Sequence, residues 1–298
     1  MRLIAGAYPA APTESGGPAG FLARLAESDL VGGLELPFVD DEARWSLDLL
    51  PTHWAHVVTA VPATAIRARA DADYGLASPD EDGRRAALAV TATLRDTVDR
   101  VVQRGATVLA VELQSAPGGT GDRAAFTRSL AEIAGWEWAG ARLVVEHCDA
   151  AVGTHEPEKG FLGLDDELAA VAEVGAGVGI CVNWARSVIE TRTPGGAVAH
   201  AARAAGAGLL AGLMFSGVAD TRVGDFPAWA DAHLPPAPHE PASLLGEHEI
   251  GQTLAAVSAL DFLGVKVGAR SGDRTPTERA DGVLSALAMV AQGKHVVL

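Results

Sequence analysis

Acidic and basic residues stand inside or directly behind several short apolar segments, where a carboxylate can act as a general base or hold a cation. The clearest case is LVVEHCD, in which Glu146 and His147 follow a run of apolar residues. Four similar segments carry Glu35 in GGLELPF, Glu112 and Gln114 in LAVELQS, Asn183 and Arg186 in VNWAR, and Lys266 in GVKVGAR. Together these residue types could supply a base, a compensating cation and hydrogen-bonding groups for a small polar substrate.

A single carboxylate at the end of a strand often has only a structural role, in which it accepts a hydrogen bond from a backbone N–H or pairs with an arginine. Several carboxylates at the same end of a sheet need another explanation. A group of them repels itself unless a cation, a metal or raised pKa values relieve the repulsion. Lys266 is the internal candidate for that cation, since Val265 and Val267 lie on the opposite face of its strand. The alternative is that the ammonium group of Lys266 lies in solvent, at the opposite end of the sheet or on its outer side.

Lysine is rare in this chain. Only Lys159, Lys266 and Lys294 occur among its 23 basic residues. A lysine can lose its proton whereas an arginine effectively cannot, which mildly favours a chemical role for Lys266. Lys159, in THEPEKGFL, fits either a solvated loop or a substrate contact. The formal net charge of −15 argues against nucleic acid as a partner.

The elements that must position these residues repeat along the chain. Eight short apolar runs predict strands at residues 3–7, 33–38, 55–61, 107–113, 142–148, 178–183, 209–215 and 265–267. Most intervals hold stretches with helical periodicity, such as residues 83–104. Eight such units predict an α/β fold, a (β/α)8 TIM barrel, as one domain over residues 1–298.

Two connections, after the third and seventh strands, are unusually long. They run from Pro62 to Asp82 and from Gly217 to Glu247. Loops on that side of a barrel build the active-site face, so we interpret them as lids over a pocket, with solvated excursions as the alternative. The chain lacks a G-x-G-x-x-G motif, a P-loop and a G-x-S-x-G elbow, which disfavours nucleotide binding and serine hydrolase chemistry.

Cysteine content and hydropathy indicate the compartment. Two cysteines cannot build a disulfide framework, and the first residues do not form a secretory leader, so we expect a reduced, cytoplasmic protein. No apolar run reaches the roughly 18 residues of a membrane span, which predicts no membrane association. Whether the chain forms a homo-oligomer stays open.

The order of these motifs carries a resemblance. With GLELPF, VELQ, LVVEHCD, VNWAR and VKVG at successive strand ends, the chain resembles the xylose isomerase-like TIM-barrel superfamily of sugar isomerases and epimerases. Within it, AYPAAP, YGLAS, EHCD, PEKGFL and FSG are similar to a bacterial family of unassigned function. The resemblance covers essentially the whole chain.

The resemblance implies a divalent-metal site, and this sequence departs from it. Superfamily members typically bind the ion through a Glu on strand five, a D-x-x-H on strand six, a His on strand seven and an acid on strand eight. Glu146 matches the first, but the later positions hold Asn183, Arg186, Phe215 with Ser216, and Lys266. We therefore expect Lys266 and Arg186 to supply the positive charge. A divalent metal held by Glu146 with Asp231 and His233 is the alternative.

The resulting prediction is a sugar, sugar-acid or polyol isomerase or epimerase of carbohydrate metabolism. Glu146 would abstract a proton next to a carbonyl, and Lys266 would stabilise the oxyanion or relay a proton. The expected substrate-binding residues are Glu35, Glu112, Gln114, His147, Asn183, Arg186 and His233. Two alternatives remain: a Schiff-base lyase or aldolase that uses Lys266, and a catalytically silent sugar-binding barrel.

Overall fold

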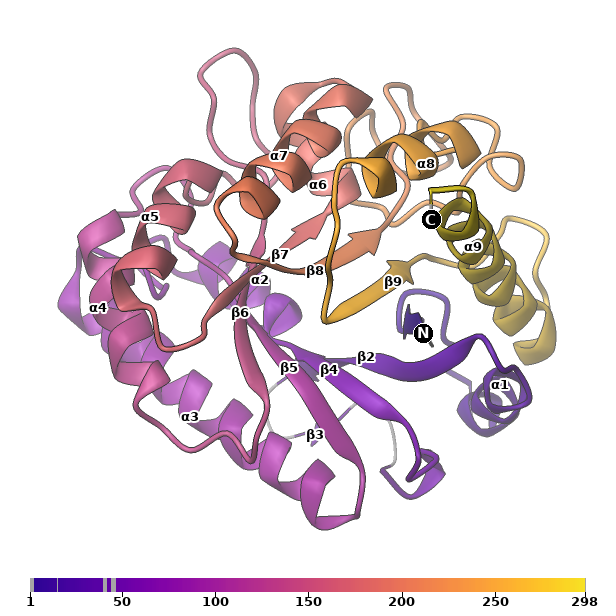
Figure 1. Ribbon diagram of the computed structural model, residues 1–298, viewed down its shortest axis with the longest axis horizontal. Coiled ribbons are helices and arrows are strands. Elements are labelled where there is room, and N and C mark those ends of the chain that lie inside the picture. Colours follow the sequence, from indigo (N-terminus) through magenta and orange to yellow (C-terminus); the bar gives the residue numbers. More distant parts are fainter. Residues whose placement is uncertain (1–2, 15, 40–41, 44–46, 298) are drawn as a thin grey trace.

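Eight parallel strands form a closed barrel in the computed structural model, which describes residues 3–14, 16–39, 42–43 and 47–297. They are β1 (Leu3–Gly6), β2 (Val31–Val39), β4 (Ala55–Thr59), β5 (Thr107–Leu113), β6 (Arg142–His147), β7 (Gly179–Asn183), β8 (Leu210–Phe215) and β9 (Phe262–Lys266). Strand β1 pairs with both β2 and β9, which closes the sheet (Figure 1). A short strand, β3 (Glu42–Ala43), pairs antiparallel with the end of β2. The predicted (β/α)8 barrel is confirmed.

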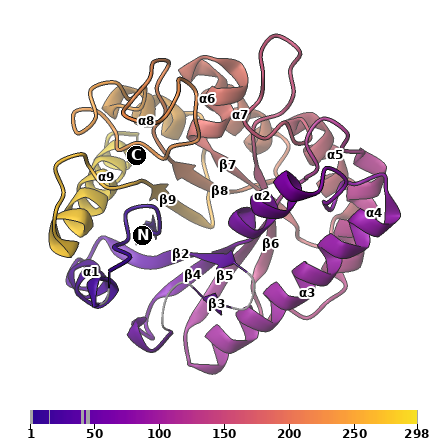
Figure 2. The ribbon, with the colours of Figure 1, turned by 180° about the vertical axis from the view of Figure 1, so that it is seen from behind.

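Helices surround the barrel (Figures 1 and 2). They are α1 (Gly17–Ala26), α2 (Val61–Ala70), α3 (Glu81–Gln103), α4 (Arg123–Ala134), α5 (Leu164–Val174), α6 (Trp184–Thr191), α7 (Pro194–Gly206), α8 (Glu247–Ala255) and α9 (Pro276–Val297). A short 3-10 helix, η1 (Leu47–Leu49), precedes β4. The first helix, α1, packs against the last, α9. Across the ranges that the structure describes, none of the helices has both the length and the apolar character needed to span a membrane.

Side chains of the strands alternate between the barrel interior and the helix layer. A buried interior cluster consists of Ile4, Val57, Ala110, Val144, Cys181, Ala211, Met214 and Phe262. Val265 and Val267 instead belong to the larger hydrophobic core that includes the helices. Because Lys266 lies between these two valines, its side chain faces the interior, in agreement with the alternation of the sequence.

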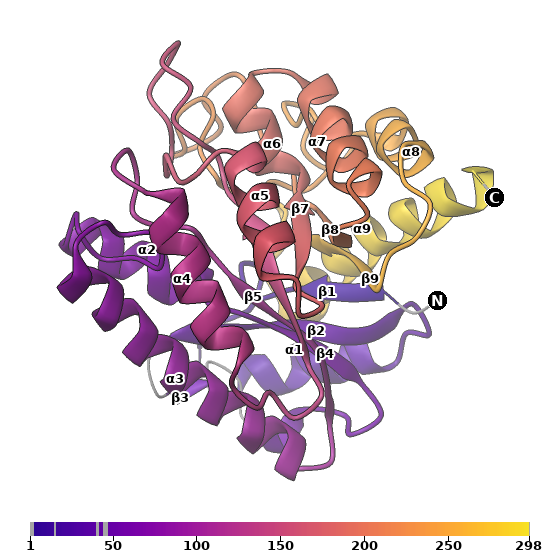
Figure 3. The same ribbon diagram turned by 60° about the vertical axis from the view of Figure 1, so that its left-hand side comes forward.

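The two long connections lie where the sequence places them, and they differ in structure. Residues 60–80, after β4, include α2, so the expected loop is partly helical, and its Tyr74 is buried. Residues 216–246, after β8, are tied at their base by a bridge between Gly217 and Leu234. Figure 3 shows a third connection, residues 148–163 after β6, standing out from the molecule near α5 and α6.

The junction between β7 and α6 positions a charged side chain of the site. Asn183 ends the strand and also caps the helix, since its Oδ1 accepts a hydrogen bond of 3.4 Å from the backbone N of Arg186. Arg186 consequently lies in the first helical turn, directly behind the end of the strand.

Candidate active site

Glu146, in β6, is the most highly coordinated side chain inside the barrel. Its Oε1 lies 2.8 Å from Lys266 Nζ and 2.6 Å from Arg186 Nη1. Asn183 Nδ2 lies 3.5 Å from the same oxygen. The other oxygen, Oε2, accepts hydrogen bonds of 3.1 Å from Gln114 Nε2 and 3.4 Å from Thr59 Oγ1. The structure thus brings together residues from β4, β7, α6 and β9, and Gln114 directly after β5, around one carboxylate of β6.

Lys266 bridges two of the carboxylates. Its Nζ lies 2.5 Å from Glu35 Oε1 and 2.8 Å from Glu146 Oε1, and all three side chains are fully buried. The ring of Tyr8 lies 5.8 Å from the same nitrogen, a distance that permits a cation–π contact. Burial lowers the pKa of Lys266, but Glu146 and Glu35 outweigh it and hold the pKa well above its usual value. Lys266 is therefore an ammonium ion.

Arg186 connects this centre to the connections after β6 and β8 at the barrel mouth. Its Nε lies 3.0 Å from Asp231 Oδ2, and Lys159 Nζ lies 2.6 Å from the same oxygen. Asp231 belongs to the connection after β8 and Lys159 to the one after β6. Successive contacts therefore link six residues of alternating charge: Lys159, Asp231, Arg186, Glu146, Lys266 and Glu35. We call this series the charge chain. Side-chain exposure falls along it, from 10% at Lys159 to 0% at Glu35.

Glu112 lies at the inner end of the charge chain. Ligand atoms of Glu35, Glu112 and Glu146 all lie within 4.8 Å of one another. Burial raises the pKa of Glu112 well above its usual value, and the charges of Glu146 and Glu35 add to the effect, so Glu112 retains its proton. The charge chain itself contains three carboxylates and three basic side chains.

The electrostatic environment of Glu146 makes it a weak base while Arg186 and Lys266 contact its carboxylate. Burial raises its pKa, but Arg186 and Lys266 outweigh that cost and hold the pKa far below the usual value for a glutamate. Glu35 differs, because burial and the neighbouring Glu146 raise its pKa despite Lys266. The two carboxylates that share Lys266 thus have opposite tendencies to take up a proton.

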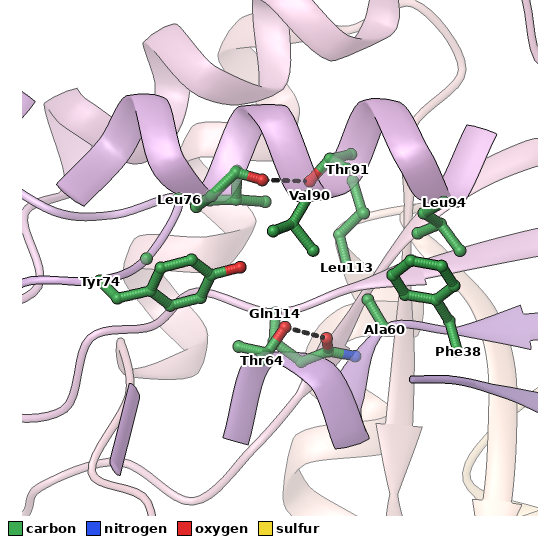
Figure 4. A pocket seen from close by; sticks show the side chains of 12 residues that line it. Phe38, Ala60, Thr64, Tyr74, Leu76, Val90, Thr91, Leu94, Leu113 and Gln114 are labelled. Atoms are coloured by element: carbon green, nitrogen blue, oxygen red, sulfur yellow. Dashed lines mark hydrogen bonds between the residues drawn. The ribbon is translucent and has the colours of Figure 1, made fainter. Parts of the chain in front are cut away.

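Gln114 is held from both sides. Its amide nitrogen donates to Glu146, while its Oε1 accepts a hydrogen bond of 3.3 Å from Thr64 of α2. Figure 4 shows this bond at the edge of a cavity of about 10 Å³, which also contacts Tyr74 and Leu113. That volume is about what one water molecule needs. Helix α2, within the connection after β4, therefore orients Gln114, a hydrogen-bond partner of Glu146.

His147 is the predicted site residue that the structure does not bring into the barrel. It is on the outer face of β6, where Nδ1 lies 2.7 Å from Glu167 Oε2 and Nε2 lies 3.0 Å from Glu190 Oε2. Burial lowers its pKa, but Glu167 and Glu190 outweigh it and raise the pKa to about 10. With both ring nitrogens bonded and the side chain fully buried, His147 has no position from which to contact a substrate at the mouth.

His233 lies at the mouth beside Asp231. Its Nδ1 is 3.0 Å from Ser216 Oγ and 3.3 Å from Asp231 Oδ1, and its ring meets Tyr8 edge to face. Burial lowers its pKa to about 4, against the opposing effect of Asp231, so the ring is neutral near pH 7. It is 14% exposed, which makes it the most accessible of the predicted binding residues named above.

The residues present do not fit a metal held in the superfamily manner. The three-carboxylate group of Glu35, Glu112 and Glu146 has the right chemistry, but Lys266 Nζ already contacts two of its members. In the alternative set, Asp231 Oδ2 is bonded to Lys159 and Arg186. Lys266 thus contacts the carboxylates of the first set, and Lys159 and Arg186 contact the carboxylate of the second, so basic side chains already supply positive charge to both.

Two contributors to the site follow the same strand-end rule but were missed in the sequence. Tyr8 comes just after β1, and Thr59 is the last residue of β4. Each lies at the carboxyl end of its strand, as do Glu146 and Asn183, so their positions carried the signal. For Asp231 the sequence suggests only a role as a metal ligand, since nothing in its loop sequence indicates a basic partner.

Solved structures first define the class of protein. The fold matches D-allulose 3-epimerase from Methylomonas sp. with a TM-score of 0.61, at 13% identity and 98% coverage of each chain. A D-psicose 3-epimerase gives 0.56 at 16% identity, covering 95% of this chain and 94% of that one. A xylose isomerase domain protein of Salmonella typhimurium LT2 gives 0.60 at 11% identity, covering 97% and 96%. The barrel is therefore xylose isomerase-like in fold.

Within that fold, the chain belongs to the family described as "Domain of unknown function (DUF4862)", which matches residues 4–281. An uncharacterised protein of Salmonella typhimurium strain LT2 is 38% identical over 282 residues, which cover 89% of this chain and 88% of that protein. The xylose isomerase-like fold and the unassigned family that the motifs indicate are both confirmed.

Proposed function

We propose that this protein is an isomerase or epimerase of a small polyhydroxylated carbonyl compound, a sugar or its acid derivative, that works without the superfamily's metal. The observation that carries the proposal is the pair of cations on Glu146, since Lys266 and Arg186 lie 2.8 and 2.6 Å from its Oε1. They supply positive charge beside a carboxylate inside a barrel whose fold is shared with D-allulose and D-psicose 3-epimerases.

The reaction moves one proton and one electron pair. Glu146 takes the proton from the carbon next to the substrate carbonyl, and the electrons of that C–H bond form an enediolate. Lys266 and Arg186 stabilise the negative charge that develops on its oxygen. Return of the proton from Glu146 to the neighbouring carbon, with the hydroxyl proton moving to the former carbonyl oxygen, gives an isomer. An epimer needs a second acid or a water molecule that donates a proton to the opposite face, while Glu146 keeps the proton it took. In this proposal Gln114 and Asn183, which hold Glu146, bind substrate hydroxyls.

Substrate contact must raise the basicity of Glu146. Two cations hold its pKa low in the present state, so it accepts a proton poorly. A substrate carbonyl that draws Arg186 or Lys266 away from Oε1 removes part of that effect and raises the pKa of Glu146. The base is then strengthened only when a substrate is bound, which limits proton exchange without turnover.

Solvent hydrogen exchange tests the proposal. A panel of ketoses and keto acids is incubated with the protein in D2O, and NMR follows deuterium incorporation next to each carbonyl. We expect one compound to exchange, and Glu146→Gln to slow its exchange by about a hundredfold or more. Glu156→Gln, which removes an exposed carboxylate from the connection after β6, is the matched control and should leave the rate unchanged. Unchanged exchange in Glu146→Gln would exclude this base.

The ion pairs of Lys266 disfavour the Schiff-base alternative, because attack on a carbonyl needs a neutral amine and its pKa is raised. Borohydride trapping with candidate carbonyl compounds checks this, and the expected result is no added mass on Lys266.

The silent sugar-binding barrel is the second candidate function, because the acidic and basic residues of the charge chain pair with one another. Binding of a sugar without any deuterium exchange would support that candidate instead.

A further inference from the structure

We infer that Arg186 and Lys159 form an anion subsite, which the carboxylate of Asp231 fills in the ligand-free protein and which the carboxylate of a sugar acid takes in the complex. The inference deepens the proposed function, on which it rests, by naming the substrate class. Among sugars and their derivatives it selects those that end in a carboxylate.

The geometry around Asp231 is that of a bound carboxylate. One oxygen, Oδ2, accepts from Lys159 Nζ at 2.6 Å and from Arg186 Nε at 3.0 Å. These cations come from two different parts of the fold, the connection after β6 and the first turn of α6. Arg186 also reaches Glu146 through Nη1, so an anion in the place of Asp231 would lie one guanidinium away from the proposed base.

The segment that carries Asp231 is short and lies between two backbone anchors. Trp229 N bonds to Ala219 O at 2.8 Å, and Leu234 N bonds to Gly217 O at 3.0 Å. Within that span, residues 230–233 hold the aspartate. A carboxylate on such a short segment at the barrel mouth can leave the subsite while the anchors on either side stay in place.

Backbone strain at both ends of this segment favours its release. Trp229 has φ 64° and His233 has φ 51°, and both are non-glycine residues in the left-handed region. A bulky side chain rarely adopts that conformation, so the surrounding contacts must hold it there. Gly268 N donates a 2.7 Å hydrogen bond to His233 O, and Lys159 and Arg186 hold Asp231 through its ion pairs. An external carboxylate that replaced them would allow the backbone to relax.

Space for a ligand lies next to the subsite. A surface cavity of about 370 Å³ is lined by Lys159 together with Glu158, Phe161, Gly118 and Arg69. Its volume falls in the range of about 300–1,000 Å³ that is usual for small-molecule sites. Lys159 therefore contacts both Asp231 and a cavity that can hold a polyhydroxylated chain.

The donor set indicates a carboxylate rather than a phosphate. The subsite offers two charged donors, and its occupant in the present state is itself a carboxylate. A phosphate carries up to two charges and three strong acceptor oxygens, and it would leave acceptors unmatched beside the buried Glu146. This contrast decides which probes test the inference.

Three probes with the same six-carbon chain separate these cases: D-gluconate, the neutral D-glucitol and D-glucitol 6-phosphate. Calorimetric titration measures their binding to the wild-type protein and to Asp231→Ala, which removes the internal competitor. We expect D-gluconate to bind Asp231→Ala about tenfold or more tightly than the wild type, because an intramolecular carboxylate competes at high effective concentration. D-glucitol should show no gain, and D-gluconate should raise the unfolding temperature of the variant more than D-glucitol does.

Two controls keep the outcome specific. Asp225→Ala removes an exposed carboxylate from the same connection and should leave D-gluconate binding unchanged. Adding Lys159→Met to Asp231→Ala should abolish the gain. If Asp231→Ala folds poorly, Asp231→Asn removes the charge and keeps the shape.

The inference is overturned if neither Asp231 variant gains D-gluconate affinity over Asp225→Ala, or if the phosphate gains more than the carboxylate. Its failure is distinguishable from failure of the proposed function, which deuterium exchange measures separately. A gain in D-gluconate binding with no deuterium exchange on any compound would support the anion subsite and contradict the proposed reaction. Deuterium exchange on a neutral ketose with no such gain would support the proposed reaction and contradict the anion subsite.

Discussion

Glu146 and His147 are neighbours on β6, yet they organise two buried polar clusters on opposite faces of the strand. The outer one, His147 with Glu167 of α5 and Glu190 of α6, consists of residues from a strand and two helices, and both nitrogens of the ring are bonded. The inner one, around Glu146, continues as the charge chain to Asp231, which lies beside His233 on the connection after β8 at the barrel mouth. A buried ionic cluster that ends at the surface on a loop can exchange a partner for a ligand.

Under the proposed function, the outer cluster stabilises the fold, whereas the inner cluster both stabilises the fold and carries out the reaction. Both remove charged groups from water, and both satisfy them with partners of opposite charge. Substitutions in the two clusters should therefore both lower the free energy of unfolding, but only those in the inner cluster should change hydrogen exchange on a substrate.

The largest effect is expected for Lys266→Met. The substitution leaves Glu35 and Glu146 without their shared cation in a fully buried site, which should lower the free energy of unfolding by about 3–5 kcal/mol. Chemical denaturation measures the loss. The double variant Lys266→Met with Glu35→Gln should recover part of it, because one stranded charge is then removed. A loss below about 1 kcal/mol would mean that these charges are not a buried pair.

A smaller loss is expected for His147→Gln in the outer cluster. Glutamine keeps one donor but removes the positive charge, so the hydrogen bonds to Glu167 and Glu190 weaken and the loss should be about 1.5–3 kcal/mol. Deuterium exchange on a substrate, measured with the folded variant, should match the wild type. A variant as stable as the wild type but with slower exchange would place His147 in the reaction after all.

The pH dependence of stability distinguishes the clusters further. The pKa of His147 is raised in the folded state to about 10, from a usual value near 6.5. Its contribution is therefore full below about pH 6.5 and is lost as the pH rises toward 10. The difference in unfolding free energy between wild type and His147→Gln should shrink from pH 6 to pH 10. A difference that grows over this range would contradict the assigned ionisation.

The smallest effect is expected for Thr64→Val, which keeps the side-chain shape. It removes the 3.3 Å hydrogen bond to Gln114 Oε1 and should cost about 0.5–1.5 kcal/mol of stability. Because Gln114 also holds Glu146, exchange should slow modestly, and Thr64→Ser should restore the rate. Failure of serine to restore it would assign the effect to packing rather than to the hydrogen bond.

Much of this architecture could be predicted from the sequence because strand residues alternate between two environments. The two valines beside Lys266 correctly predict an inward lysine, and the strand-end positions of Glu146, Gln114, Asn183 and Arg186 predict that they meet. The same alternation implies that Glu146 and His147 cannot both face the barrel interior, since adjacent strand residues point to opposite sides of the sheet. His147 is predicted from the sequence as a binding residue, whereas its side chain lies on the outer face of β6 against Glu167 and Glu190.

Loop contacts lie beyond such reasoning. The pairing of Asp231 with Arg186 and Lys159 joins three segments, and no periodicity governs the connection after β8. Tyr8 and Thr59 follow the strand-end rule, but their residue types gave no reason to select them. Periodic elements are thus predictable from local patterns, whereas contacts made by a long loop depend on how the whole barrel closes.

The most direct test of the central claim compares deuterium exchange by chelator-treated protein with exchange by the same protein after divalent metal is added. Positive charge from Lys266 and Arg186 predicts that the EDTA-treated, metal-analysed protein exchanges at the full rate and that added Mn²⁺ or Mg²⁺ does not increase it. Exchange that disappears with the chelator and returns with a stoichiometric divalent ion would contradict the claim.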